Sequence, residues 1–405
     1  NVTLCLNGHE IRSEGSYVIQ TPWSGTVTFT LCDCKAGGKI AHTVNSSSNS
    51  AGVNLNNTST SQQTFIMYNG CITGNKTTHG AGVFLYSNTT FTMYGGSITE
   101  NECNSDTYLP CGGGVYAFTN ATFTMYGGDI TKNKADYGGG VSTSGDTANF
   151  TMYGGSITEN HANKSGGGIY SNSNNISIYG GSVTDNSVTK NGKAGGIYVS
   201  SSDTLTVGGN VNISGNWQGD SKESGSKSNV YLNGNTSGSS ATIVIENKLT
   251  GAPIGVTTAN APTAGNPVTI VTGNSIEETY KDSFQADNAA YGVSYNSTDK
   301  VLQLHKHSGG TATCTAEAVC TTCGQPYGNT NPNNHDLEHH EAKAATCTEV
   351  GWNAYNTCKR EGCSYTTYKE IAALNHALVH HEAQAPTCTA VGWEAYDTCS
   401  RCDYS

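Results

Sequence analysis

The amino-acid sequence predicts an all-β protein in two parts: a right-handed parallel β-helix with three strands per turn, and a C-terminal array of small Cys/His-rich modules. Three observations predict this fold class. A segment with a Y-G-G-like turn recurs six times, and its starts lie 26, 32, 27, 26 and 29 residues apart. Glycine supplies 50 of the 405 residues without the strict period of collagen. Nine of the 15 cysteines follow residue 305, which sets the tail apart from the rest.

Each repeat contains three short segments whose apolar residues share one face of a strand. The first segment contributes the pairs Phe65/Met67, Phe91/Met93, Phe123/Met125, Phe150/Met152, Ile176/Ile178 and Leu205/Val207. The second contributes Ile72, Ile98, Ile130, Ile157, Val183 and Ile213. The third follows a run of glycines and contributes Val83, Val115, Val141, Ile169 and Ile197. A single repeat cannot bury such an edge, whereas stacked repeats form a continuous core and pair their backbones with neighbouring turns.

Asparagine occupies one corner of every repeat, where its amide can bond to the equivalent amide of the next turn and tolerates a left-handed backbone. These residues are Asn75, Asn101, Asn133, Asn160, Asn186 and Asn216. Glycine pairs permit positive φ at other corners. Four of the asparagines follow Glu100, Lys132, Glu159 and Asp185. We expect Lys132 to form cross-strand ion pairs with the glutamates of the adjacent turns.

The composition divides the chain into three regions. We expect the β-helix to span residues 1–274, a β hairpin to cap it over residues 275–305, and tandem Cys/His-rich repeats to fill residues 306–405. A cap is needed because an open terminal turn leaves an aggregation-prone edge. The tail repeats cover about 314–340, 347–381 and 388–405, and we expect the third to be truncated before its histidine.

Three cysteines and a following histidine recur in the tail. Disulfides consume thiols in pairs and would leave one cysteine over in each repeat, whereas three thiolates and one imidazole complete a tetrahedral zinc site. His335 lies 12 residues after Cys323, and His376 lies 13 residues after Cys363. We therefore predict structural zinc, held repeat by repeat. The predicted ligands are Cys314, Cys320, Cys323 and His335, then Cys347, Cys358, Cys363 and His376, then Cys388, Cys399 and Cys402.

Disulfides are the alternative for the tail, with one bond per repeat and the third cysteine free or linking repeats. Either staple is reasonable because repeats of about 40 residues have too little core to fold unaided. In the N-terminal region, Cys103 and Cys111 bracket the insertion in the 32-residue period, and we predict a disulfide between them. Cys5, Cys32, Cys34 and Cys71 lie on strand-like segments of neighbouring turns, either as stacked buried thiols or with a disulfide from Cys5 to Cys32 or Cys34.

The charge pattern excludes several functions. The formal net charge is −11, so no basic surface for nucleic acid is expected. No run of apolar residues is long enough to span a membrane within this window. Arg12 is the sole arginine before the tail, and no Asp-Asp or Asp-x-Asp pair occurs, although β-helix lyases and hydrolases need such clusters. We expect a protein that is not an enzyme, and keep a polysaccharide-degrading β-helix enzyme as the alternative.

Two columns of aromatic residues are candidate binding surfaces. Tyr116, Tyr170 and Tyr198 follow inward residues and should project outward. Tyr94, Tyr126 and Tyr153 form the other column, at the T-M-Y-G-G corner. Exposed aromatic rings can stack on sugars or anchor protein partners. The alternative is that the stacked tyrosines only cover the corners.

The GG[GA]-[VI] and [IV]-T-x-N elements resemble the repeats of polymorphic-membrane-protein-type bacterial adhesins. The opening LNGHEI and the block LCDCKAGGKI are similar to β-helical ectodomains of surface proteins from anaerobic Gram-positive bacteria. This resemblance covers about residues 1–305. The Cys/His units are similar to tandem units near the ends of Gram-positive surface proteins, where they serve as spacers or wall-proximal modules.

The resemblance implies an extracellular adhesin, on the cell surface or secreted, whose β-helix is an elongated scaffold. Its expected partners are host or microbial surface glycans or proteins. A structural stalk or filament subunit is a further alternative, in which the β-helices associate end to end.

Overall fold

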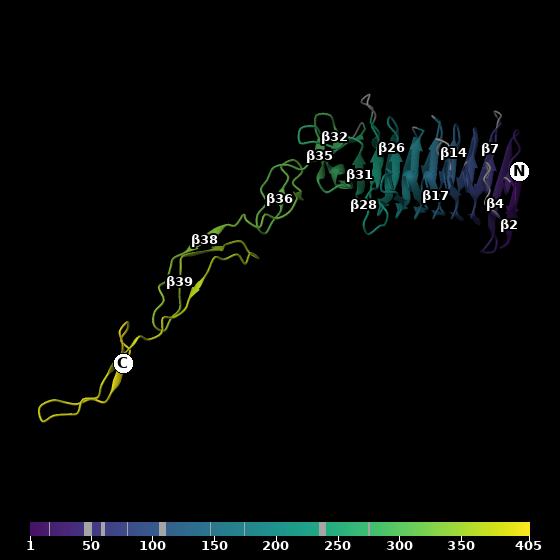
Figure 1. Cartoon of the computed structure of the whole chain (residues 1–405). Helices are drawn as coiled ribbons and strands as arrows, with labels where there is room; N and C mark the ends of the chain where they lie inside the picture. The colour runs from purple at the N-terminus through teal and green to yellow at the C-terminus, as the bar shows by residue number, and fades with distance from the viewer. Residues whose placement is uncertain are drawn as a thin grey trace. The chain divides into compact units, whose positions relative to one another are not determined.

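The computed structural model describes residues 1–15, 17–43, 51–57, 61–78, 80–104, 111–145, 147–173, 175–234, 240–273 and 276–405. The chain forms two compact units, Asn1–His307 and Ser308–Ser405 (Figure 1). The first unit is a parallel β-solenoid of about nine turns, which confirms the predicted β-helix. Within the described residues, no helix has the length and apolar character needed to cross a bilayer.

The strands of the first unit stack on their counterparts in neighbouring turns as four columns. The first column contains β1 (Val2–Cys5), β4 (Val27–Cys32), β7 (Gln63–Met67), β11 (Thr89–Met93), β15 (Thr122–Met125), β19 (Asn149–Met152), β23 (Asn175–Thr184), β26 (Thr204–Ser214), β30 (Thr242–Leu249) and β32 (Val268–Thr272). The second contains β2 (Glu10–Ser13), β5 (Lys39–His42), β8 (Cys71–Thr73), β12 (Ser97–Thr99), β16 (Asp129–Thr131) and β20 (Ser156–Thr158), and continues in the C-terminal halves of β23 and β26.

The third column contains β3 (Ile19–Gln20), β6 (Val53–Leu55), β10 (Val83–Leu85), β14 (Val115–Phe118), β18 (Val141–Ser144), β22 (Ile169–Asn172), β25 (Ile197–Val199), β29 (Val230–Leu232), β31 (Ile254–Thr258) and β33 (Phe284–Ala286). A fourth column follows the asparagine corner and adds a short strand to the three expected per turn. It contains β9 (Lys76–Thr77), β13 (Glu102–Cys103), β17 (Lys134–Tyr137), β21 (His161–Ser165), β24 (Ser187–Val188) and β27 (Trp217–Gln218), which pairs antiparallel with β28 (Ser226–Lys227).

Equivalent side chains stack in register along the solenoid. Phe91 of β11 lies opposite Phe65 in β7 and Phe123 in β15, and its ring centroid is 4.6 and 4.8 Å from theirs. All the apolar residues predicted to face inward are at most 1% exposed, which confirms the predicted core. Burying each such side chain stabilises the fold by about 1.5–3 kcal/mol relative to leaving it in water.

Glycine is required where two turns approach closely. Gly96 ends the corner between β11 and β12 with φ +85°, a left-handed backbone that glycine adopts without strain. A Cβ at this position would lie 2.6 Å from Cε of Met67 in the preceding turn. Gly128 and Gly155 repeat the same contact with Met93 and Met125.

A hairpin covers the C-terminal end of the solenoid. The 3₁₀ helix η1 (Glu278–Ser283) precedes β33, and then β34 (Tyr291–Asn296) and β35 (Val301–Lys306) pair antiparallel. Strand β35 also pairs antiparallel with β32. The backbone edge that β32 would otherwise expose is thereby occupied, as a capped solenoid requires.

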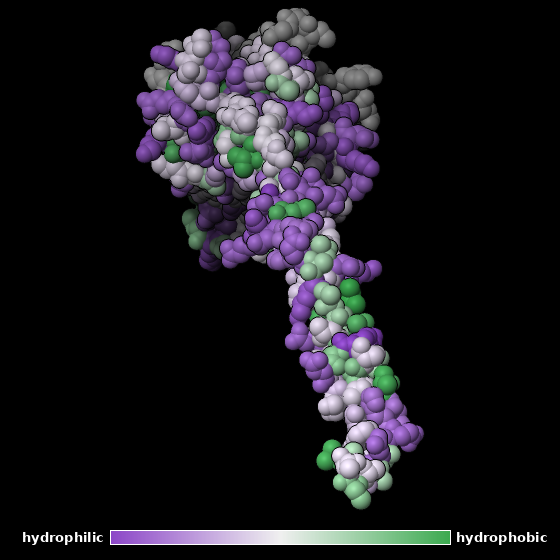
Figure 2. Space-filling view, turned by 90° about the vertical axis from the view of Figure 1, so that its left-hand side faces the viewer, coloured by the Kyte–Doolittle hydropathy of each residue, from purple (hydrophilic) through white to green (hydrophobic). Residues whose placement is uncertain are grey.

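The second unit consists of short antiparallel strand pairs. These are β36 (Ala318–Val319) with β37 (Pro326–Tyr327), β38 (Leu337–His340) with β40 (Tyr355–Cys358), β39 (Gly351–Trp352) with β41 (Glu370–Ile371), and β42 (Leu378–His381) with β43 (Tyr396–Cys399). Its buried apolar side chains are one alanine and three cysteines, Ala318, Cys320, Cys347 and Cys399. Apolar side chains, green in the narrow lower part of Figure 2, instead reach its surface. The unit therefore has almost no hydrophobic core.

Candidate metal centres and binding surfaces

Four potential metal ligands converge at one place between β38 and β40; we call them cluster 1. The donor atoms of Cys314, His335, Cys358 and Cys363 all lie within 4.8 Å of one another. Cys314 Sγ is 3.6 Å from Cys358 Sγ, and Cys363 Sγ is 3.4 Å from His335 Nδ1. The strand register places Leu337 opposite Cys358, which brings the segment carrying His335 beside the end of β40.

The same arrangement recurs one repeat later, as cluster 2. Cys347, His376, Cys399 and Cys402 again have their donor atoms within 4.8 Å of one another. Cys347 Sγ is 3.6 Å from Cys399 Sγ, and Cys402 Sγ is 3.2 Å from His376 Nδ1. Leu378 lies opposite Cys399 in the pair β42/β43, as Leu337 does in the first cluster.

These separations suit a tetrahedral ion. A zinc ion bound by sulfur at about 2.3 Å and nitrogen at about 2.0–2.1 Å separates two sulfurs by about 3.8 Å, and a sulfur from a nitrogen by about 3.5 Å. The clusters show 3.6 Å between sulfurs and 3.2–3.4 Å between sulfur and nitrogen. A disulfide would need about 2.0 Å. Both clusters are therefore arranged as three thiols and one imidazole around a common point, the donor set of a structural zinc site.

Neighbouring groups orient the histidines and favour thiolate. The rings of His335 and Tyr365 are stacked with centroids 3.8 Å apart, and His376 stacks on Tyr404 at 4.2 Å. Burial raises the pKa of Cys358, but backbone N–H groups, first that of Arg360, outweigh it and lower this pKa to about 6. Thiolate, the form that binds metal, is thus the favoured state of this ligand near neutral pH.

Cys399 has the corresponding position and behaves in the same way. Burial raises its pKa, but the N–H of Arg401 and the side chain of His376 outweigh burial and lower the pKa to about 5. By contrast, burial raises the pKa of Cys347 to about 11. The cluster therefore combines a thiolate-favouring ligand with one that would release a proton on binding a metal.

We expected each repeat to supply all the ligands of one site, but each cluster contains residues of two successive repeats. The first cysteine of a repeat, Cys314 or Cys347, lies with the last two cysteines of the following repeat. The reason is the pairing of strands from successive repeats, which sequence spacing alone does not show. Of the remaining predicted ligands, Cys320 is buried, Cys323 is half-buried and Cys388 is exposed, and none of them belongs to either cluster.

A third group of sulfurs lies at the beginning of the solenoid. Cys5 of β1 pairs in register with Cys32 of β4, and Cys5 Sγ is 2.6 Å from Cys34 Sγ. The three donor atoms lie within 4.8 Å of one another. The hydrogen bond to Cys34 lowers the pKa of Cys5 and raises that of Cys34 to about 11. All three are thiols in this structure, with Cys5 and Cys34 exposed, so the expectation of buried thiols is wrong for these two.

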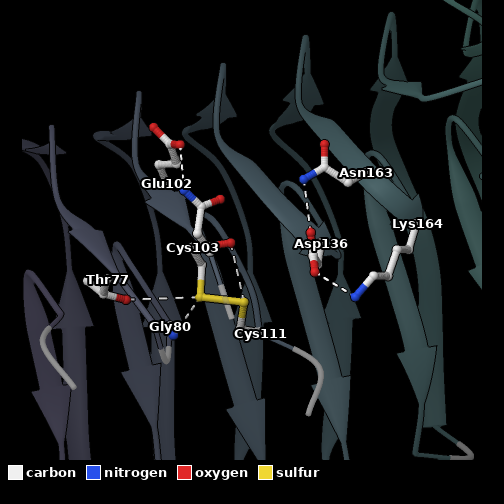
Figure 3. Close-up of a disulfide and its surroundings, with 9 residues drawn as sticks. Thr77, Gly80, Glu102, Cys103, Cys111, Asp136, Asn163 and Lys164 are labelled. Carbon is white, nitrogen blue, oxygen red and sulfur yellow. Dashed lines mark hydrogen bonds and ion pairs between the residues drawn. A yellow bond between two sulfur atoms is a disulfide. The ribbon is translucent and has the colours of Figure 1, made fainter. Parts of the chain in front are cut away.

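The disulfide predicted between Cys103 and Cys111 is present (Figure 3). Cys103 lies in β13, and its Sγ accepts hydrogen bonds from the backbone N–H of Gly80, at 3.3 Å, and from the hydroxyl of Thr77, at 4.0 Å. Both cysteines are buried with Ala81 and Ala135 in a small cluster outside the main core. The bond closes the one long insertion among the regular repeats at its base.

One of the two predicted tyrosine columns is exposed. We call it the tyrosine ladder: Tyr68, Tyr94, Tyr126, Tyr153 and Tyr179. The first four rings are 48–54% exposed, and successive centroids along the ladder are 5.1, 5.2, 5.1 and 5.5 Å apart with nearly parallel planes. Each ring therefore covers the face of the neighbouring ring. The four exposed tyrosines therefore offer ring edges and hydroxyl groups, and a sugar cannot stack face-on between neighbouring rings, while the hydroxyl of the half-buried Tyr179 donates to Glu246.

The other column is largely covered, which differs from our expectation that it projects into solvent. Tyr116 and Tyr198 are only 4% and 9% exposed, and Tyr170 is half-buried. Tyr170 packs against Tyr137 as well as Tyr198, and the rings of the column stack as those of the ladder do. Burial raises the pKa of Tyr116 and of Tyr198 to about 12. These residues serve packing, and Tyr94, Tyr126 and Tyr153 remain as candidates.

Buried asparagines form a continuous hydrogen-bonded ladder, as their repeat position predicts. Each Nδ2 donates to Oδ1 of the next asparagine at 2.8–3.0 Å from Asn75 to Asn216. The chain of bonds continues from Asn216 to Asn229 at 3.1 Å and ends on the carboxylate of Asp287 at 2.6 Å. At its beginning, Nδ1 of His42 lies 2.8 Å from Oδ1 of Asn75. The ladder therefore holds successive turns in register.

The charged column beside this ladder lies at corners of the solenoid. Glu100, Lys132, Glu159 and Asp185 all adopt left-handed backbone, with φ between 55° and 57°. Lys132 Nζ is 3.8 Å from Glu159 Oε2, and Asp185 pairs with Lys222. The ion pair of Lys132 with Glu159 is the expected one. The structure has no ion pair between Lys132 and Glu100, both of which are described.

A groove that sequence reasoning missed lies near the end of the solenoid, with a volume of about 650 Å³. Lys190, Lys193 and Lys227 line it together with Tyr231. Lys193 Nζ lies 5.3 Å from the centroid of the Tyr231 ring, and none of the three lysines forms an ion pair with a described residue. Lys190 and Lys193 lie three residues apart in the connection between β24 and β25, whereas Lys227 belongs to β28, and nothing in the sequence places Lys227 beside the other two.

Comparison with known proteins gives no family for this chain. No protein-family model, no curated protein and no solved structure matches it. The resemblance to bacterial adhesins therefore stays a prediction, and the function has to be argued from the two clusters, the tyrosine ladder and the groove.

Proposed function

We propose that the protein is an extracellular, adhesin-like surface protein whose solenoid presents an elongated binding face. The observation that carries this proposal is the tyrosine ladder. Its rings are stacked along the solenoid axis at intervals of about 5 Å. The strands that carry them pair in register with the strands of the preceding and following turns. A long ligand lying along the axis would meet the same chemical group in every turn. Because the tyrosine rings are already stacked on one another, binding would cost little side-chain conformational entropy.

The geometry of the ladder defines what such a ligand offers. Since the ring faces are mutually covered, contact is made by ring edges, which carry partial positive charge, and by phenol hydroxyls, which donate and accept hydrogen bonds. Hydroxyl-rich glycan chains and extended protein segments have matching acceptors and donors. The groove lined by Lys190, Lys193 and Lys227, which also contains Asp287, adds three ammonium groups that acidic groups on such a ligand could pair with, on a chain whose net charge is −11.

The proposal assigns binding, and no catalytic step, to the solenoid. General acid–base hydrolysis of a glycan needs two carboxyl groups flanking the scissile bond, roughly 5–10 Å apart. The carboxylates that recur at one position of the repeat include Glu159 and Asp185. Because each of these two is held in an ion pair at a left-handed corner, we assign them to the structure of the corner.

The test is binding by three matched variants of the full chain on glycan arrays and on intact host and bacterial cells. In the first, Tyr94, Tyr126 and Tyr153 become Ala, and in the second they become Phe. In the third, Thr92, Thr124 and Thr151 become Ala; these half-buried residues stack in register in β11, β15 and β19 and alternate with the buried phenylalanine and methionine side chains. We expect the Ala variant to lose binding at least tenfold, the Phe variant to lose the share due to the hydroxyls, and the Thr variant to bind as the wild type does. Equal binding by all three, or cleavage of a polysaccharide by the wild type, contradicts the proposal.

For the second unit we propose that clusters 1 and 2 bind zinc as a structural metal. A Cys3His set closes the coordination shell and leaves no open position for catalysis. Metal binding would also supply the stability that the unit lacks, since its buried apolar side chains are so few.

Elemental analysis of the purified full chain against the variants Cys363→Ser and Cys402→Ser tests this proposal. Each variant should hold one zinc equivalent fewer than the wild type. Disulfides detected by mass spectrometry in the wild type, with no change in zinc content between the variants, would rule it out.

A further inference from the structure

We propose that each metal ion of the second unit joins two successive repeats, taking two ligands from each. This inference rests on the zinc binding proposed above and goes further in its architecture. Let A, B and C be the repeats at 314–340, 347–381 and 388–405. Cluster 1 then takes Cys314 and His335 from A, and Cys358 and Cys363 from B.

Cluster 2 repeats the rule one step along the chain. It takes Cys347 and His376 from B, and Cys399 and Cys402 from C. In both clusters the histidine lies 23 residues before the second cysteine of the following repeat, Cys358 or Cys399. Only the spacing of the last two cysteines differs, five residues in B and three in C. Two clusters with the same division of ligands make an accidental convergence of thiols a poor explanation.

Backbone hydrogen bonds hold the first cysteine of a repeat near its histidine. The N–H of Cys314 donates to the carbonyl of Asn334, the residue before His335, at 3.1 Å. In repeat B, the N–H of Leu374 donates to the carbonyl of Thr346, the residue before Cys347, at 2.9 Å. Each repeat therefore presents its own Cys and His side by side as one half of a centre.

The other half is brought in by the following repeat, through strands and an arginine. Strand β38 of A pairs with β40 of B, and β42 of B pairs with β43 of C. Arg360, two residues after Cys358, donates to the carbonyl of Asn334, next to His335. Arg401, two residues after Cys399, donates at 2.9 Å to the carbonyl of Asn375, next to His376. Two of the three arginines in the chain thus have the same role: each hydrogen-bonds its own repeat to the preceding one.

The physical consequence is that one repeat contains only half of each metal centre. With so little apolar burial, the contacts between repeats would come chiefly from the metal and the short strands. Cys388 corresponds to Cys314 and Cys347 but belongs to neither cluster. It is therefore the matched control for Cys347, since the two have the same motif position and different predicted effects.

The test uses the zinc-loaded full chain and the variants Cys347→Ser, Cys314→Ser and Cys388→Ser. Each is treated with N-ethylmaleimide in the presence of a competing chelator, and the alkylation rate of every cysteine is followed by peptide mass spectrometry. Loss of one ligand weakens a metal site by about tenfold or more, so the partners of the missing cysteine should be alkylated faster by a similar factor.

We expect Cys347→Ser to expose Cys399 and Cys402 and to leave Cys358 and Cys363 protected. The variant Cys314→Ser should do the reverse, and Cys388→Ser should expose none of the four. If Cys347→Ser instead exposes Cys358 and Cys363, or if Cys388→Ser exposes Cys399 and Cys402, the ligands are grouped within repeats and the proposal is overturned. A rate unchanged by Cys347→Ser also overturns it.

Failure of zinc binding itself gives a different result. Every cysteine of the wild type would then react at the same rate with and without chelator, or would be recovered as a disulfide. That outcome rejects the zinc proposal as well as the bridging of repeats, whereas the outcomes above reject the bridging alone.

Discussion

The two units of this protein solve the same problem by different means. Both are built from repeats that are too thin to fold alone. In the solenoid, each turn buries three apolar columns and one polar ladder against its neighbours, so stability comes from packing. In the second unit almost no apolar side chain is buried. The side chains that meet between successive repeats there are the cysteines and histidines of clusters 1 and 2. In both units neighbouring repeats therefore contact each other through equivalent residues: stacked side chains in the solenoid, and the cysteines and histidines of clusters 1 and 2 in the second unit.

Removal of metal should have the largest effect, and should separate the two units most clearly. Structural zinc contributes about 10–16 kcal/mol to small metal-dependent folds, so a chelator should unfold the second unit and leave the solenoid intact. Limited trypsin digestion would then cut at Lys343, Arg360 and Lys369, while cleavage within the solenoid stays at the rate seen with metal. Protection of the three sites in chelator would show that the second unit is held by something other than metal.

A break in the asparagine ladder should be the most damaging single polar change in the solenoid. Asn133 donates to Asn160 and to the carbonyl of Ile98, and accepts from Asn101. Asn133→Ala leaves several buried groups without partners, at about 1–3 kcal/mol each, so we expect a loss of about 3–6 kcal/mol in the free energy of unfolding in urea. The matched control is Asn163→Ala, because Asn163 is exposed and its side chain bonds to one described residue, Asp136. Equal losses in the two variants would contradict a structural role for the ladder.

The carboxylate at the end of the ladder should make the solenoid sensitive to pH. Burial raises the pKa of Asp287, against hydrogen bonds from Asn229 and Thr257. Since the charged form is disfavoured in the folded state, stability is greatest below the unfolded pKa of about 3.9 and falls as the pH rises through the higher folded value. The melting temperature of the wild type between pH 4 and 7 should therefore fall relative to that of Asp287→Asn. Parallel curves for the two proteins would show that Asp287 does not titrate in this range.

The smallest effect is expected from the surface ion pair of Lys132 and Glu159, whose side chains are 58% and 55% exposed. Exposed pairs contribute about 0–1 kcal/mol, so Lys132→Ala should change the free energy of unfolding by less than about 0.5 kcal/mol, and less still at high salt. A larger loss in the free energy of unfolding would mean that this corner ion pair contributes more to stability than an exposed pair should.

Much of the solenoid could be predicted because its repeats are periodic. The alternation in Phe91/Met93 fixes which side chains face inward, and the recurring asparagine fixes which corner carries the ladder. The sequence does not show that Tyr116 and Tyr198 would be covered while Tyr94 and Tyr126 remain exposed, because burial depends on contacts with other segments, such as the contact of Tyr137 with Tyr170 in the covered column. That cysteines and histidines of the tail gather was accessible from the composition, but their grouping was not, because it follows from strand pairing between repeats; three further predicted ligands, Cys320, Cys323 and Cys388, lie in neither cluster.

The direction of the asparagine ladder restricts where the solenoid can change length. Every amide uses its donor on one neighbour and its acceptor on the other, so a slip of one residue at this corner would break bonds on both sides at once. The chain shows this restriction in its spacing. The separation from the last inward residue of the first column to the asparagine is eight residues in five repeats and nine in the sixth, although the repeats themselves range from 26 to 32. The insertion between Cys103 and Cys111 instead follows the asparagine corner, so the repeat is longer there while the spacing that leads to the asparagine stays at eight residues.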